Sequence, residues 1–222
     1  LSVGFRYSDI TNQLYGWADK TGTRTLTDKS IDFKLRLLEE DHRLPQLAVG
    51  IMDVGGTGIF SSEYVVASKR TGNFDWSLGL GWGNIGASNN LGNPLAKLDS
   101  SFNSRSGGGG RYGGQFRFDS FFRGSTALFG GVQYHLPSEK WVLKAEYDGN
   151  DYQSELTPLR QSSAINLGVV YRQSPSIDWS VGLERGRAMM LGVTIHAPMA
   201  QVDTPKSSDM TRPPVVYTRA ST

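Results

Sequence analysis

The sequence contains no cysteine, which excludes disulfide bonds, thiolate metal sites and cysteine nucleophiles. It has no run of about 18 apolar residues, and its mean hydropathy is -0.35, so no transmembrane helix is expected. Lysine and arginine number 23 against 21 aspartates and glutamates, so bulk charge gives no reason to expect a nucleic-acid partner. No signal peptide is visible ahead of the strand-like opening "LSVGFRYS", which suggests a processed or trimmed chain.

What the sequence does have is glycine and a period of two. Glycine occurs 27 times in 222 residues, well above its usual share of about 7%. In "FDWSLGLGWG" (Phe74–Gly83), large apolar residues at every second position alternate with small or polar ones. The same alternation occurs in residues 30–38, 141–148, 165–172, 177–184 and 189–196. Such a pattern is typical of strands with two unlike faces.

Less regular strands are predicted at residues 3–8, 47–54, 58–68, 112–122 and 126–136, which gives eleven strands in all. Turns at Gly72-Asn73, Pro137 and Pro175 indicate antiparallel hairpins. We therefore predict an all-β fold, an antiparallel transmembrane β-barrel of about 10–14 strands joined as a meander of hairpins. Residues 1–196 form the barrel domain in this prediction, and 197–222 form a proline-rich tail or linker.

Periodicity alone leaves the direction of the apolar face open, because a soluble sandwich buries that face and a membrane barrel turns it to lipid. Three features favour the membrane barrel. Glycines such as Gly79, Gly81 and Gly168 lie on the non-apolar face, where they suit a crowded interior better than a solvated surface. The strands approach the length needed to cross a bilayer. Aromatic residues near strand ends would form membrane girdles: Trp76, Trp82, Trp141, Tyr147, Tyr171 and Trp179. Burial of both Trp76 and Trp82 in a dry core would contradict this orientation.

Charged residues of both signs fall on the other face and are predicted to line the barrel interior. They are Asp32, Lys34, Arg36, Glu63, Asp75, Arg117, Asp119, Lys144, Glu146, Asp178 and Glu184. These side chains could contact a polar glycan, or they could plug the interior with their own ion pairs. For Glu63, within "DVGGTGIFSSEY", the structural ion pair is the favoured interpretation. The loop aromatics Trp17, Tyr112 and Tyr152 could stack on sugar rings or be ordinary exposed residues.

Catalytic signatures are weak. His42, His135 and His196 are scattered, and neither G-x-S-x-G nor H-E-x-x-H is present. Paired carboxylates such as Glu146 and Asp148 could in principle cleave a glycosidic bond, but such residues in a barrel interior more often balance lysine or arginine. We therefore predict no enzyme activity, no catalytic residue, no metal and no cofactor.

Several long blocks occur together in the order of one known family. They include "DKSIDFKLRLLEE", "PQLAVGIMDVGGTGIFSSEYVVASKR", "FFRGSTALFGGVQYHLP" and "KAEYDGNDYQSE", and they extend from about residue 6 to 195. The sequence resembles the YjbH-type, or GfcD-like, proteins of exopolysaccharide and group 4 capsule systems. The resemblance implies the first barrel half of a longer protein in the outer membrane of Gram-negative bacteria.

The resemblance also implies a role in polysaccharide export or assembly, with outer-membrane lipid, polysaccharide and other export-system proteins as partners. Two alternatives remain open at this point. One is a structural β-barrel that scaffolds a larger envelope complex without transport. The other is an outer-membrane enzyme that modifies glycans.

Overall fold

A computed structural model describes residues 1–14, 25–106, 118–153 and 158–196 of the chain. Its strands are β1 (Ser2–Leu14), β2 (Thr25–Leu38), β3 (Gln46–Val54), β4 (Ser62–Thr71), β5 (Phe74–Gly83), β6 (Thr126–His135), β7 (Trp141–Tyr147), β8 (Ile165–Ser174), β9 (Ile177–Glu184) and β10 (Ala188–Ile195). All are antiparallel to their neighbours, and the order in the single sheet is the order in the sequence. The predicted all-β meander of hairpins is therefore confirmed.

The turns explain why consecutive strands pair. Thr71 pairs with Phe74, so the β4–β5 connection has only two residues, and its first, Gly72, has a φ of 59°. A two-residue hairpin turn requires such a left-handed residue, and glycine adopts it without a steric penalty. The β8–β9 turn contains Pro175, which lies between the paired residues Ser174 and Ile177.

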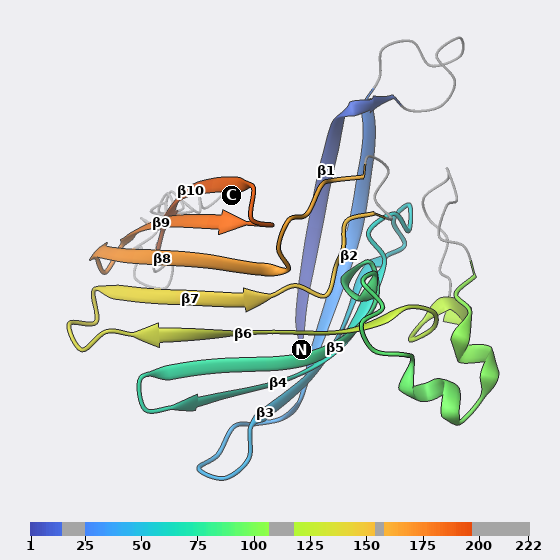
Figure 1. The fold of residues 1–222 in the computed structure, drawn as a ribbon, viewed down its shortest axis with the longest axis horizontal. Helices are drawn as coiled ribbons and strands as arrows, with labels where there is room; N and C mark the ends of the chain where they lie inside the picture. Colours follow the sequence, from blue (N-terminus) through green and yellow to red (C-terminus); the bar gives the residue numbers. More distant parts are fainter. Residues whose placement is uncertain (15–24, 107–117, 154–157, 197–222) are drawn as a thin grey trace, which may run out of the picture.

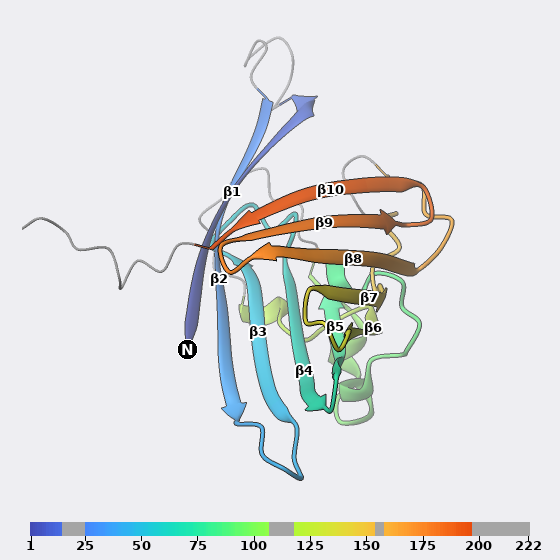
Figure 2. The same ribbon diagram turned by 90° about the vertical axis from the view of Figure 1, so that its left-hand side faces the viewer.

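The sheet curls strongly but does not close. β1 and β2 stand upright in Figure 1, whereas β6 to β10 run nearly perpendicular to them. Figure 2 shows the same change of direction from the side. The outer edges of β1 and β10 pair with no other described strand, so the closed barrel predicted from the sequence is not present in this sheet. Closing the sheet requires either contact between these two edges or further strands.

One face of the sheet is apolar over nearly its whole width. The register places Phe74, Trp76 and Leu80 of β5 opposite Tyr134, Val132 and Leu128 of β6. The match continues through Leu143, Val169 and Val181 to Leu191. On the far side, Val3, Phe33 and Leu35 continue this apolar face across β1 and β2. Most of these side chains are exposed in this structure. An exposed apolar surface of this extent marks a surface that meets lipid or protein.

The opposite, polar face contains most of the glycines of the strands, and some have a packing reason. A Cβ at Gly79 would lie 2.5 Å from the ring of Phe129, and one at Gly50 would lie 2.2 Å from the ring of Tyr64. These two rings meet edge to face, with centroids 6.2 Å apart. The glycines thus make room for large side chains on the inner side of the curved sheet, as the sequence predicted.

The long β5–β6 connection forms an insert of short 3₁₀ helices. They are η1 (Asn84–Gly86), η2 (Pro94–Lys97), η3 (Ser100–Asn103) and η4 (Phe118–Ser120). The strand predicted at 112–122 is wrong in its described part, because Phe118–Ser120 is helical. The aromatic run misled the prediction, because its rings pack within the insert and against β5 instead of alternating: Phe118 contacts Phe121, and Phe122 contacts Trp82.

Candidate functional site

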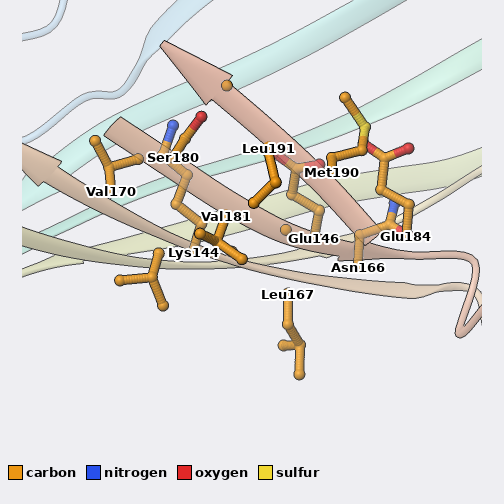
Figure 3. Close-up of a pocket in the computed structure, with 14 residues that line it drawn as sticks. Lys144, Glu146, Asn166, Leu167, Val170, Ser180, Val181, Glu184, Met190 and Leu191 are labelled. Atoms are coloured by element: carbon orange, nitrogen blue, oxygen red, sulfur yellow. The ribbon is translucent and has the colours of Figure 1, made fainter. Parts of the chain in front are cut away.

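A group of polar side chains lies close together on the polar face of β7 to β9; one of them, Asn166, accepts the backbone N–H of Arg185 at 2.8 Å. Glu146 pairs with Asn166, and the Leu167–Leu183 pair in the next position brings Asn166 opposite Glu184. Figure 3 shows these three side chains gathered on one side of the sheet, while Leu167 points to the other. We call Glu146, Asn166 and Glu184 the acidic row. Lys144 lies on the same face of β7, two residues before Glu146, and pairs with Gln133 of β6 and Gly168 of β8.

The acidic row borders an open cavity of about 420 Å³ on the inner side of the sheet. Its lining combines carboxylates, amides and aromatic rings, including Asp75, Gln133, Tyr152 and Phe129. A second hollow of about 180 Å³, drawn in Figure 3, lies over Lys144, Ser180 and Gly192. Carboxylates and amides beside an aromatic surface can hydrogen-bond and pack against a polyhydroxylated ligand.

Some of the predicted interior charges are paired. Asp75 accepts a bond from His135 at 2.7 Å and lies 3.7 Å from Arg70. Asp178 lies 3.1 Å from His196. Asp32 lies 3.5 Å from Arg6. Such contacts are what we expect if the interior is plugged by its own ion pairs.

Other predicted interior charges have no such partner. Among the described residues, none forms an ion pair with Lys34, Lys144, Glu146 or Glu184. Arg36 forms an ion pair with the exposed Glu39, at 2.6 Å, rather than with a charge across the polar face. Asp119 is exposed on η4, outside the sheet, and Arg117 lies outside the described residues. The inner wall therefore keeps charges that are available to water or to a ligand.

Glu63 does not lie with the acidic row. Its register partner is Trp82, so it lies on the apolar side of the sheet, where the insert covers it. The carboxylate is 0% exposed. It accepts two bonds from Arg105, at 2.8 and 2.9 Å, and one from the backbone N–H of Phe122 at 2.9 Å. Glu63 and Arg105 therefore form a structural ion pair that attaches the insert to β4. The expectation that Glu63 points inward is wrong.

The sequence predicted an ion pair for Glu63 but did not identify Arg105 as its partner. Arg105 belongs to "SRSGGGGR", which reads as a flexible loop, and it lies 42 residues from Glu63. No local pattern connects the two residues. The guanidinium also donates to the Ser61 hydroxyl at 2.6 Å and the Ser120 carbonyl at 3.1 Å, which fixes its position.

Tyr152 is the one predicted loop aromatic among the described residues, since Trp17 and Tyr112 lie outside them. Its hydroxyl donates to Asp148 at 2.5 Å, and the guanidinium of Arg185 lies 5.1 Å from its ring centroid. Burial raises the pKa of the Tyr152 phenol, and the bond to the Asp148 carboxylate raises it further. The ring borders the cavity, but Arg185 stacks on it.

The aromatic residues predicted as girdles all lie on the apolar face. Trp141, Tyr171 and Trp179 form one row across β7, β8 and β9, and the first two rings are 4.7 Å apart. Tyr147 is exposed toward the other end of β7. Trp76 is half-buried.

Trp82 differs from the other girdle residues. It is only 3% exposed, because Phe122 of the insert packs edge to face against it at 5.2 Å. Burial of both Trp76 and Trp82 would contradict an outward apolar face, and only Trp82 is buried.

Features of catalytic or metal centres are sparse in the described ranges. His135 and His196 each contact one aspartate, and His42 is exposed. No group of three or more histidine, aspartate or glutamate side chains there is arranged to hold a metal ion. None of the helices in these ranges is long and apolar enough to cross a membrane.

The fold and this wall define a class: an antiparallel meander sheet with a broad apolar face and a polar, partly charged inner face. All 222 residues match the family described as YjbH, exopolysaccharide biosynthesis protein. The chain belongs to the YjbH family of exopolysaccharide biosynthesis proteins, as its resemblance predicted.

One relative is the "Uncharacterized lipoprotein YjbH" of Escherichia coli (strain K12), which is 40% identical over 215 residues. The match covers 96% of this chain but only 30% of the relative, so the chain spans about a third of that protein's length. No solved structure matches.

Proposed function

We propose that this chain forms part of an outer-membrane β-barrel that assists exopolysaccharide export or assembly without catalysing a reaction. The observation that carries the proposal is the broad apolar face across the sheet, opposite a polar face on which Lys144, Glu146 and Glu184 form no ion pair with a described residue. A lipid-facing band and a polar interior are the two faces of a membrane barrel strand. The row of Trp141, Tyr171 and Trp179 suits a membrane interface, where amphipathic rings gather.

Closure of the sheet is part of this proposal. Lipid has no donors or acceptors for the open edges of β1 and β10, so a sheet in a bilayer has to pair them. The relative is more than three times as long as the matched region. We infer that strands from the remainder of the protein complete the barrel. The lipoprotein name of the relative supports a place in the cell envelope.

The inner wall supports contact with a neutral, polyhydroxylated polymer. The acidic row offers acceptors from Glu146 and Glu184 and the amide NH₂ of Asn166, whose oxygen already accepts from Arg185, and the adjoining cavity is open. Asp148 is committed to Tyr152, so the Glu146–Asp148 pair does not offer the two free carboxylates that glycoside hydrolysis needs. This supports a passive role.

Three measurements test the proposal on the full-length protein. Membrane fractionation and gel migration before and after boiling should show a heat-modifiable outer-membrane protein; identical migration and solubility without detergent would refute it. Planar-bilayer conductance separates a transport role from a scaffold, which would conduct nothing. The Glu146→Gln and Asp148→Asn variants should still export polysaccharide, and loss of a hydrolytic product in either would support the enzyme alternative.

A further inference from the structure

Three aspartates meet where the β3–β4 loop folds against the inner face of β2. Asp28 and Asp32 belong to β2, and Asp53 lies near the end of β3. Asp32 is well satisfied: it accepts the backbone N–H of Asp53 at 2.9 Å and lies 3.5 Å from Arg6. The other two carboxylates are not.

Asp28 and Asp53 are almost completely buried, at 0% and 5% exposure. One oxygen of each is used by the loop. Asp28 accepts the N–H and the hydroxyl of Thr57, at 2.9 and 2.8 Å, and Asp53 accepts the N–H of Phe60 at 2.9 Å. No described residue donates a hydrogen bond to the remaining oxygens, Oδ2 of Asp28 and Oδ1 of Asp53. Each of the two buried carboxylates thus keeps one oxygen without such a donor.

Gly56 shows how close the two carboxylates come. A Cβ on Gly56 would lie 1.8 Å from Oδ1 of Asp53 and 3.1 Å from Oδ1 of Asp28. The Asp53 oxygen here is its unpartnered one, and the Asp28 oxygen is the one bonded to Thr57, so the two carboxylates lie on the same side of this glycine. Any larger residue at position 56 would occupy the space beside Oδ1 of Asp53.

The local charges do not balance. Three carboxylates lie near one guanidinium, that of Arg6, which is 3.5 Å from Asp32 and lies over the ring of Phe60. Lys29, the neighbouring cation on β2, lies over the ring of Tyr7. Tyr7 is its register partner, on the other face of the sheet. Buried like charges are strongly unfavourable unless a counter-charge is supplied.

We propose that Asp28 and Asp53 bind a calcium ion between β2 and the β3–β4 loop, with their unpartnered carboxylate oxygens as ligands. Calcium takes hard oxygen ligands in flexible geometry, and backbone carbonyls and water can complete its shell. Magnesium demands a stricter octahedron and sheds water reluctantly, so it binds more weakly here. The ion would fix the loop to β2, and with it Ser61, whose hydroxyl accepts from Arg105.

Isothermal titration of the EDTA-treated, detergent-solubilised full-length protein with calcium chloride tests the site, with magnesium chloride in parallel. We expect saturable calcium binding and weaker magnesium binding. Asp28→Asn and Asp53→Asn should each weaken calcium binding at least about tenfold, the low end of what loss of even an outer-shell partner does. Asp119→Asn removes the same charge on exposed η4 and should bind calcium as the wild type does.

Loss of the fold is separated from loss of the site by urea unfolding. An amide oxygen keeps the bonds from Thr57 or Phe60, so both asparagine variants should fold. In calcium-free buffer Asp53→Asn should be at least as stable as the wild type, because it removes repulsion with Asp28. Calcium should raise the urea midpoint of the wild type and of Asp119→Asn only.

Several results would overturn the proposal. One is a wild-type protein that does not bind calcium, or that binds magnesium at least as tightly as calcium. Another is stabilisation of the wild type by acid but not by calcium, which would assign a proton to the pair. The third is undiminished binding in either Asp28→Asn or Asp53→Asn. None of these outcomes bears on polysaccharide export, so the two proposals fail independently.

Discussion

The buried pair of Glu63 and Arg105 gives the sharpest prediction about stability, because removing one partner differs physically from removing the other. Arg105→Met leaves a carboxylate with 0% exposure and a single remaining donor, the backbone N–H of Phe122. An uncompensated buried charge costs about 3–5 kcal/mol. That is a large part of the roughly 5–15 kcal/mol by which a domain is stable.

Glu63→Gln should be milder. The glutamine oxygen can still accept from Phe122, and the side chain of Arg105 is 16% exposed and keeps its bonds to Ser61 and Ser120. The lost charge-assisted bonds should therefore destabilise the protein by about 1–3 kcal/mol. The double variant should resemble Glu63→Gln, because it contains no orphaned carboxylate.

Urea unfolding of the lipid-folded protein, followed by tryptophan fluorescence, measures these differences. Trp82 contacts Phe122 and is a local reporter. Proteolysis of the insert should follow the same order. If Arg105→Met is no more destabilising than Glu63→Gln, or if the double variant is worse than Arg105→Met, burial of the Glu63 charge is not what determines the stability of this attachment.

Three further predictions concern the two faces of the sheet and the loop beside the cavity. Val181→Arg on the exposed apolar face should impair membrane assembly, by about 2–4 kcal/mol if the position lies at mid-bilayer. Ser180→Arg on the polar face should assemble normally, and equal effects of the two variants in a folding assay would contradict the assigned orientation. Gly79→Val should destabilise the protein by about 1–3 kcal/mol in urea, because its Cβ would lie 2.5 Å from the ring of Phe129, and a neutral result would show that the ring can move. Because the pKa of Tyr152 is raised, its stabilising contribution is complete below the ordinary value of 10.0 and is lost as pH rises through the folded pKa. The stability difference between wild type and Tyr152→Phe should therefore shrink in alkaline urea titrations, and a constant difference would contradict this.

The alternation in the sequence was sufficient to predict most strands. The predicted range Phe74–Gly83 is β5 as observed, and Ile177–Glu184 is β9. These segments have unlike faces and short turns, so local information determines them. Residues 116–119, "FRFD", alternate as well, but the prediction of a strand failed at Phe118–Ser120, where the rings pack within the insert.

Contacts distant in the sequence were beyond prediction. Glu63 was assigned to the wrong face because its segment follows a glycine turn, where a change of one position reverses every side chain. Its partner lies in an insert with no regular pattern. The Asp28–Asp53 pair likewise depends on the folding of the β3–β4 loop against β2, and no spacing in the sequence indicates it.

The strict sequential order of the strands has a consequence for how such a protein can change its size. Each of the ten described strands pairs with its neighbours along the chain and with no other described strand, so a hairpin can be added or removed at an edge without rearranging any existing pair. Most of the loop closures during folding are short, since each strand meets a partner that has just been synthesised. Sheets of this kind can therefore grow by duplication of hairpins, so that the number of strands can change in evolution while the polar face of the existing strands stays the same.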